Sequence, residues 1–159
     1  YVLCFIATLG TKITKNIDGG KRRMIPEFDE RGYLPPGVHV ATLDEVRQRF
    51  GNNVRRNELL SNFNVLLEVI RRVGASRLFL DGSFVTDKEI PGDIDAILVI
   101  PDDLNTASPE AGVLYEADIR FSVDLFIVRE RNTNWLLRWL EFFGHDRNDE
   151  PKGLVEVTL

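Results

Sequence analysis

The sequence predicts an α/β fold, in the broad sense that includes α+β, with helices flanking a small mixed β-sheet. Helical periodicity and short runs rich in Val, Ile and Phe alternate along the chain, with neither an internal repeat nor a low-complexity tract. The chain has 159 residues, of which 43% are hydrophobic, enough for one domain with a real core. We therefore expect an irregular N-terminal arm over residues 1–40 and a single domain over residues 41–159.

The predicted arm carries few signs of regular structure. Residues 11–37 are rich in Gly, Pro and charge and show neither helical nor alternating periodicity. The opening YVLCFIATLG is apolar, but it is too short to span a bilayer and no cationic region precedes it, so we expect no signal peptide and no membrane contact. Cys4 is the single cysteine, which excludes an internal disulfide and fits a reducing, cytoplasmic location.

Two helices are predicted directly after the arm. Thr42 and Glu45 form a T-x-x-E capping box, which predicts a short helix as far as Phe50. Residues 54–73 then repeat apolar side chains at steps of three and four, which predicts one long amphipathic helix. Its apolar positions are Leu59, Phe63, Leu66, Leu67, Ile70 and Val73.

The remaining elements are mainly strands. Residues 77–80, 94–100 and 121–128 are rich in β-branched and aromatic side chains, and residues 153–159 alternate like a last strand. Residues 133–143 return to helical spacing and end at a glycine. The stretch around residues 109–120 is weakly patterned and is compatible with one or more helical turns.

Two acidic residues stand out because they lie in an apolar strand. Asp93 and Asp95 are two positions apart, so both side chains leave the same face of the strand. Two such carboxylates ~4 Å apart repel by about 4 kcal/mol at an effective dielectric constant of ~20. A nearby cation removes this repulsion, and Mg²⁺ is a hard ion that prefers carboxylate, water and phosphate oxygens. The pair therefore predicts a magnesium seat that a ligand completes.

A third carboxylate extends this seat. Asp124 lies in the middle of the apolar run FSVDLFIV, and pairing of the two strands would place it beside Asp93 and Asp95. Three carboxylates on one face suit two metal ions, which stabilise the attacking and leaving oxygens of an in-line displacement at phosphorus. Asp124 would then also accept the proton of the attacking hydroxyl.

The residues that precede this seat suit a phosphate group. Gly82 and Ser83 end an apolar strand, where a glycine lets the backbone approach a ligand and a serine offers a hydroxyl and amides to phosphate oxygens. Nine residues separate Ser83 from Asp93, a length that lets the chain reverse. Phosphate cradle and metal seat should therefore lie together.

At these residues the chain resembles the nucleotidyltransferase superfamily typified by DNA polymerase beta, and especially the minimal nucleotidyltransferases of prokaryotic toxin–antitoxin pairs. The shared pattern is an apolar strand, Gly82-Ser83, nine residues, Asp93-Ile94-Asp95, and the single Asp124 in a later strand, within residues 55–130. The resemblance implies a nucleotidyltransferase-like fold. It also implies that the Gly-Ser turn holds a triphosphate, that the paired aspartates bind two Mg²⁺ ions, with Mn²⁺ as a substitute, and that the third aspartate joins the metal site as base.

One part of the family pattern is absent. The minimal enzymes often continue after the Gly-Ser turn with Arg and a second Gly, whereas this chain continues with Phe84 and reaches a cation at Lys88. Lys88 is therefore our nucleotide-binding candidate for the phosphate-facing charge, and Lys152, beside the last strand, is a weaker one.

A purely structural interpretation of the acids stays open at this point. Asp93 would cap the turn, and Asp95 and Asp124 would pair with Arg77 or Arg120. A calcium site without catalysis is a further alternative.

The sequence thus predicts a nucleotidyltransferase that moves a nucleoside monophosphate from a triphosphate, ATP above all, to a hydroxyl group and releases pyrophosphate. The acceptor would belong to a partner protein, such as a toxin, or to an RNA 3′ end. The net charge of −5 argues against non-specific DNA binding. The alternative is an inactive protein of the same fold, an antitoxin that acts by covering its partner.

Overall fold

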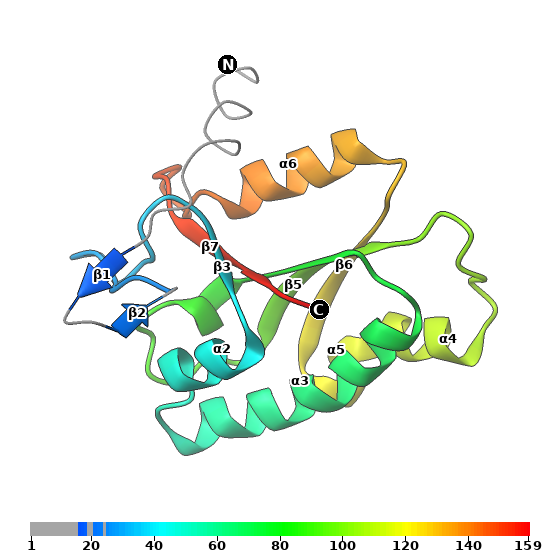
Figure 1. The fold of residues 1–159 in the computed structure, drawn as a ribbon, viewed down its shortest axis with the longest axis horizontal. Helices are drawn as coiled ribbons and strands as arrows, with labels where there is room; N and C mark the ends of the chain where they lie inside the picture. The colour runs from blue at the N-terminus through cyan, green and yellow to red at the C-terminus, as the bar shows by residue number, and fades with distance from the viewer. Residues whose placement is uncertain (1–15, 19–20, 24) are drawn as a thin grey trace.

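A five-stranded mixed sheet forms the centre of the protein in the computed structural model, which describes residues 16–18, 21–23 and 25–159 (Figure 1). Residues 1–15, which include Cys4 and the apolar opening segment, lie outside the described residues. Across the sheet the strands follow the order β3 (Gly37–Ala41), β7 (Gly153–Val157), β4 (Arg77–Asp81), β5 (Ile94–Ile100) and β6 (Val123–Arg129).

The connections explain the strand directions. β4 and β5 are antiparallel, because only the short 3₁₀ turn η1 (Gly82–Val85) and a loop join them. β5 and β6 are parallel, and the crossover between them carries α4 (Pro109–Tyr115) and α5 (Ala117–Phe121). β3 and β7 are also parallel, while β4 and β7 are antiparallel. The predicted small mixed sheet with flanking helices is confirmed.

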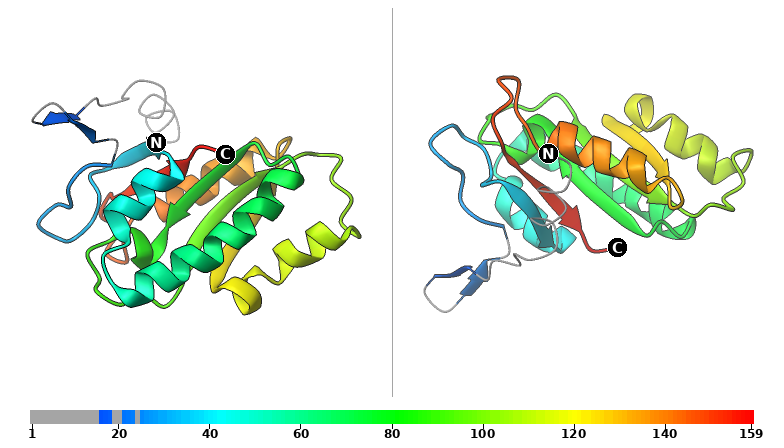
Figure 2. Two further views of the ribbon diagram at one scale, coloured as in Figure 1. Left: turned by 60° about the horizontal axis from the view of Figure 1, so that its bottom comes forward. Right: turned by 90° about the horizontal axis from the view of Figure 1, so that it is seen from above.

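One face of the sheet is covered by α2 (Leu43–Phe50) and α3 (Val54–Arg72), together with α4 and α5 (Figure 2). Every second residue of the central strands points into this larger core, as the period of a strand requires. The strand residues of this core include Leu78, Leu80, Ile94, Ala96, Leu98, Ile100, Val123 and Val155.

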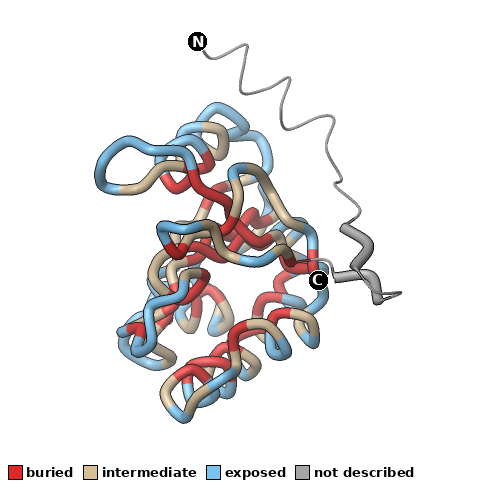
Figure 3. Tube along the Cα trace, turned by 90° about the vertical axis from the view of Figure 1, so that its left-hand side faces the viewer, coloured by how far each residue is buried: buried red, intermediate tan, exposed pale blue. Residues whose placement is uncertain are grey.

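The other face carries α6 (Thr133–Phe143), which packs on a second apolar cluster. Phe126 of β6 is central to it, with its ring centroid 4.7 Å from that of Trp139 and 4.9 Å from that of Phe143. The buried members of the cluster are Phe79, Ile97, Val99, Val128, Leu140, Phe143 and Leu154. In the tube view the buried segments run through the middle of the molecule and the exposed loops lie outside them (Figure 3).

Most predicted elements occur close to their predicted bounds. The capping box is confirmed, since the Thr42 hydroxyl accepts from the Glu45 amide and the Glu45 carboxylate accepts from the Thr42 amide. The long helix, the strand over residues 94–100 and the helix over residues 133–143 are also present. No helix among the described residues is long and apolar enough to cross a bilayer.

The predicted irregular arm is wrong in two places. Residues 37–40 belong to β3, where the edge strand gains its partner only from β7, more than a hundred residues later. β1 (Asn16–Asp18) and β2 (Lys21–Arg23) form a separate antiparallel pair. All three strands are too short for periodicity to show in the sequence, and the neighbouring Gly and Pro residues obscure them.

Candidate functional site

Three aspartates form a row across the sheet. In the pairing of β4 with β5, Asp81 lies opposite Asp95, and in the pairing of β5 with β6, Asp95 lies opposite Asp124. Directly opposite residues project from the same face of a sheet, so the three side chains share one face. The predicted pairing of the two acid-bearing strands is confirmed, and it adds Asp81, which the sequence analysis did not include.

The row lies on the face that carries α6, just beyond the apolar cluster beneath that helix. Each acid is two residues along its strand from a member of the cluster, and residues two apart share a face. The pairs are Asp81 with Phe79, Asp95 with Ile97, and Asp124 with Phe126. The carboxylates therefore begin where the apolar cover of α6 ends.

Asp93 lies immediately before β5 and is half-buried. Its negative charge contributes to raising the pKa of both Asp95 and Asp124, so the three predicted acids act on one another. The strand runs over residues 94–100, as its predicted bounds have it, so Asp93 precedes the strand, although the prediction of the metal seat treated both acids as strand residues. The Ile94 amide donates to the Ser122 carbonyl at 3.0 Å.

Asp95 is the centre of the electrostatic strain. Its pKa is raised from 3.8 to about 6, first by burial and then by the charges of Asp93, Asp81 and Asp124, while Lys152 opposes the rise. Burial, Asp93 and Asp118 likewise raise the pKa of the exposed Asp124. The described residues thus hold an excess of negative charge at this end of the sheet.

The Gly-Ser turn touches this centre directly. Gly82 has φ +70°, a left-handed conformation that side chains rarely adopt, and a Cβ atom at this position would overlap the Oδ2 atom of Asp95. The backbone of the turn therefore packs against the Asp95 carboxylate. Ser83 follows in η1, is half-buried, and accepts the Thr86 hydroxyl on its carbonyl at 2.8 Å.

A buried ion pair closes the other end of the row. The Lys152 ammonium donates to the Asp81 carboxylate, and the two residues are 7% and 3% exposed. Burial raises the pKa of Asp81, and Lys152 together with the Gly82 amide opposes that rise. The sequence analysis considered Lys152 only as a weak candidate for a nucleotide contact. The one feature of the sequence that could have drawn attention to Asp81 is that this acid directly follows the apolar run RLFL.

Arg56 holds the segment that leaves the Gly-Ser turn. Its guanidinium donates to the carbonyls of Phe84, Thr86 and Lys88 at 2.7, 2.8 and 2.6 Å. Arg56 is 2% exposed, although it is not one of the apolar positions that the helical periodicity predicts for the core. A buried arginine satisfied by main-chain carbonyls has no pattern in the sequence that reveals it.

Two neighbours of Arg56 extend the same support. Asn53, the N-cap of α3, donates to the Glu89 carbonyl at 2.7 Å, and Arg55 donates to the carbonyls of Pro91 and Gly92. The N-terminal turn of α3 thus positions the whole connection from the Gly-Ser turn to Asp93.

The structural interpretation of the acids is wrong in its pairings. Arg77 forms a two-point ion pair with Glu156, at 2.7 and 3.0 Å, and Arg120 pairs with Glu116 at 2.6 Å. Neither arginine takes the part of a counter-ion to the row. Lys88 is exposed in the loop, where its carbonyl is held by Arg56.

The donor set fits a hard divalent cation in its chemistry, because carboxylate oxygens that share a sheet face with no arginine among them are the ligands such ions prefer. In the part of the chain that the structure describes, no three acidic, histidine or cysteine side chains already converge as a metal-binding group. The carboxylates of the row share a face of the sheet, and like charges placed on one face repel one another.

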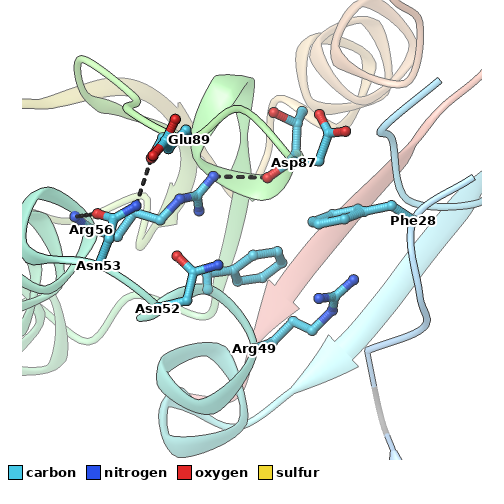
Figure 4. Close-up of a pocket in the computed structure, with 9 residues that line it drawn as sticks. Phe28, Arg49, Asn52, Asn53, Arg56, Asp87 and Glu89 are labelled. Carbon is cyan, nitrogen blue, oxygen red and sulfur yellow. Dashed lines mark hydrogen bonds between the residues drawn. The ribbon is translucent and has the colours of Figure 1, made fainter.

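A cavity of about 340 Å³ is lined by residues from the end of α2, the start of α3 and the loop after η1 (Figure 4). None of the predicted site residues lines it. Its walls are Phe28, Arg49, Phe50, Asn52, Asn53, Arg56, Thr86, Asp87 and Glu89. The Arg49 guanidinium lies 4.1 Å above the Phe28 ring and 3.3 Å from the Glu27 carboxylate, so this cation of the cavity wall is already paired.

Comparison with known proteins identifies the chain at the level of a family. The model of a family of unknown function, DUF6932, matches residues 26–158, which include all five strands of the central sheet. The chain belongs to this family. No curated protein and no solved structure gives a significant match. Because the family's description carries no activity, a function for this DUF6932 protein has to be argued from the carboxylate row itself.

Proposed function

We propose that this DUF6932 protein is a magnesium-dependent nucleotidyltransferase. An acceptor hydroxyl oxygen forms a bond to the α-phosphorus of a nucleoside triphosphate, ATP above all. The bond from that phosphorus to the oxygen bridging the β-phosphate breaks, and pyrophosphate leaves. The hydroxyl proton passes to a carboxylate of the protein, so charge and atoms balance.

One observation carries the proposal. Strand register gathers Asp95 and Asp124 on one face, next to Asp93, and the same register brings the backbone of Gly82 into contact with Asp95. A turn able to hold phosphate thus adjoins carboxylates able to hold the cations that accompany phosphate. The raised pKa of Asp95 supports this, since an accumulation of negative charge without arginine partners is a feature of functional sites.

Each residue of the proposed site has a role that follows from its position. The amides and hydroxyl at Gly82 and Ser83 bind the triphosphate, and Asp93 and Asp95 hold the magnesium ions together with Asp124. Bound magnesium would neutralise the charge that develops on the phosphate oxygens. Asp124 lies on the edge strand β6 and is exposed, so an acceptor hydroxyl can reach it from solvent and transfer its proton there.

The proposal also covers the acceptor of the nucleotide and the location of the protein in the cell. An exposed base on an edge strand suits a large acceptor, and the candidates are a hydroxyl of a partner protein, such as a toxin, or an RNA 3′ end. Lys88, exposed in the loop after the turn, is the candidate contact to the outer phosphates. A cytoplasmic location would supply both ATP and such acceptors.

The test is transfer of α-labelled phosphate from ATP in the presence of Mg²⁺, with candidate protein and RNA acceptors. Asp93→Ala and Asp124→Ala should reduce labelling by a hundredfold or more, because each removes a group that the reaction uses. Asp103→Ala is the matched control, since Asp103 is an exposed acid in the turn after β5. Its labelling should equal that of the wild type.

Equal labelling by all four proteins, or none by the wild type with every acceptor, would overturn the enzymatic proposal. In that case, partner capture that withstands Asp93→Ala and Asp124→Ala would favour a protein that acts by covering its partner.

A further inference from the structure

Asp81 and Lys152 are two of the three charged side chains buried among the described residues, and they pair with each other. They are 71 residues apart in the chain, Asp81 at the end of β4 and Lys152 immediately before β7. Desolvating two charges is costly, and the attraction between them often fails to recover that free energy. The pair therefore invites a functional explanation.

The pair leads directly to the Gly-Ser turn. The Asp81 carboxylate receives Lys152 on one side and the backbone amide of Gly82 on the other. Gly82 in turn packs against the Asp95 carboxylate, so closely that no Cβ atom fits between them. One continuous series of contacts runs from Lys152 through Asp81 and Gly82 to Asp95.

Lys152 is itself held in place by its backbone. Its amide donates to the Gly144 carbonyl at 2.8 Å, and the next amide, that of Gly153, donates to the Leu34 carbonyl at 2.9 Å. The ammonium group thus extends from the anchored entry to β7 towards the row. Such an anchor can hold a turn that has only four residues of 3₁₀ helix of its own.

We propose that Lys152 is a positioning residue that acts through Asp81 to hold the Gly-Ser turn in its phosphate-binding conformation. The inference rests on the proposed function, because it assigns the turn to phosphate. Lys152 contacts neither phosphate nor acceptor. It holds the Asp81 carboxylate, which holds the Gly82 amide, and the turn keeps its place against Asp95.

A purely structural pair and a positioning pair make different predictions. Replacing both members of a buried ion pair by apolar residues of similar size is often neutral or stabilising. Asp81→Leu combined with Lys152→Met should therefore give a folded protein whose melting temperature equals or exceeds that of the wild type. If the pair positions the turn, the same protein should bind phosphate poorly.

The binding experiment uses inorganic tripolyphosphate with Mg²⁺ in calorimetry, so no acceptor or base recognition is needed. The double variant should bind at least tenfold more weakly than the wild type, and amides 82–85 should exchange their hydrogens at least tenfold faster in the ligand-free protein. The control replaces another ion pair between β4 and β7, with Arg77→Met and Glu156→Leu. Its affinity and its exchange at amides 82–85 should match those of the wild type.

The outcomes separate the two proposals. If the wild type binds magnesium tripolyphosphate and the double variant binds equally well with unchanged exchange at the turn, the positioning role is wrong and the proposed function stands. If the wild type does not bind it, the proposed function fails, and the positioning role fails with it. Should Lys152→Met alone fail to fold, the double variant still decides the question.

Discussion

Asp95 is the residue at which folding and the proposed chemistry conflict. A carboxylate with a pKa of about 6 is protonated more readily in the folded protein than in the unfolded chain, where its pKa is near 3.8. Folding stability from this group is therefore present at low pH and is lost as pH rises through about 4 to 6. The full shift would correspond to about 3 kcal/mol, but Asp95 is only partly buried, so screening by solvent reduces its contribution to about 1–2 kcal/mol.

Asp95→Asn should accordingly stabilise the protein above pH 7 and have little effect at pH 4. The amide cannot ionise, so it avoids the repulsion from Asp93, Asp81 and Asp124. Urea unfolding at a series of pH values measures this, and the difference between variant and wild type should grow between pH 4 and pH 7 to about 1–2 kcal/mol. A difference independent of pH would show that Asp95 is not the strained group.

Gly82 is the second residue with a specific requirement. Gly82→Ala should destabilise the protein by at least about 2 kcal/mol, because alanine is strained at positive φ and its Cβ would overlap Asp95. Urea unfolding checks it, with Gly92→Ala as a control, because no atom lies within 4 Å of a Cβ there. Adding Asp95→Ala to Gly82→Ala should restore part of the stability. A strictly additive double variant would contradict the contact.

At the level of elements, the N-terminal turn of α3 has two tasks. The apolar positions along α3 build the larger core, as the periodicity predicts. At its N-terminal end, Asn53, Arg55 and Arg56 donate to carbonyls of the loop between β4 and β5. Helix α3 thus holds in place the loop that connects the Gly-Ser turn to Asp93. The loop depends on this helix because it lies outside the strand ladder.

Arg56→Met should destabilise the protein by about 2–4 kcal/mol, since three carbonyls lose their buried donor. Hydrogen exchange should report faster opening of residues 84–92 than of the sheet. Arg71→Met is the control on the same helix, where an exposed pair with Glu68 is lost, and it should change stability by less than about 0.5 kcal/mol. Equal effects of the two substitutions would show that Arg56 does not hold the loop through these carbonyls.

At the scale of the whole molecule, α6 divides one face of the sheet into two parts. Its aromatic side chains cover the cluster around Phe126, and the carboxylate row begins immediately beyond it. The covered part contributes packing, and the uncovered part leaves the charged surface at which the proposed nucleotide would bind.

Phe143→Ala should therefore destabilise the protein by about 3–5 kcal/mol, because Phe143 is 8% exposed and its ring contacts Phe126. The adjacent Phe142 is 68% exposed, and Phe142→Ala should change stability by less than about 1 kcal/mol. Unfolding in urea compares the two. A large effect of Phe142→Ala would indicate that α6 is packed differently from this arrangement.

The sequence by itself determined the local elements and part of the site. Periodicity and caps located the long helix, the capping box at Thr42 and the strand that follows Asp93, because each depends on neighbours within a few residues. The two-residue spacing of Asp93 and Asp95, and the acid within a later apolar run, were likewise visible without coordinates.

Only the tertiary structure decided which distant residues meet. Register between strands places Asp81 opposite Asp95 and brings Lys152 to Asp81, and packing decides that Arg56 faces a loop rather than water. A local pattern specifies the face on which a side chain lies, but it contains no information about the partner strand or about what covers that face. Burial of a charge is therefore a property of the assembled fold.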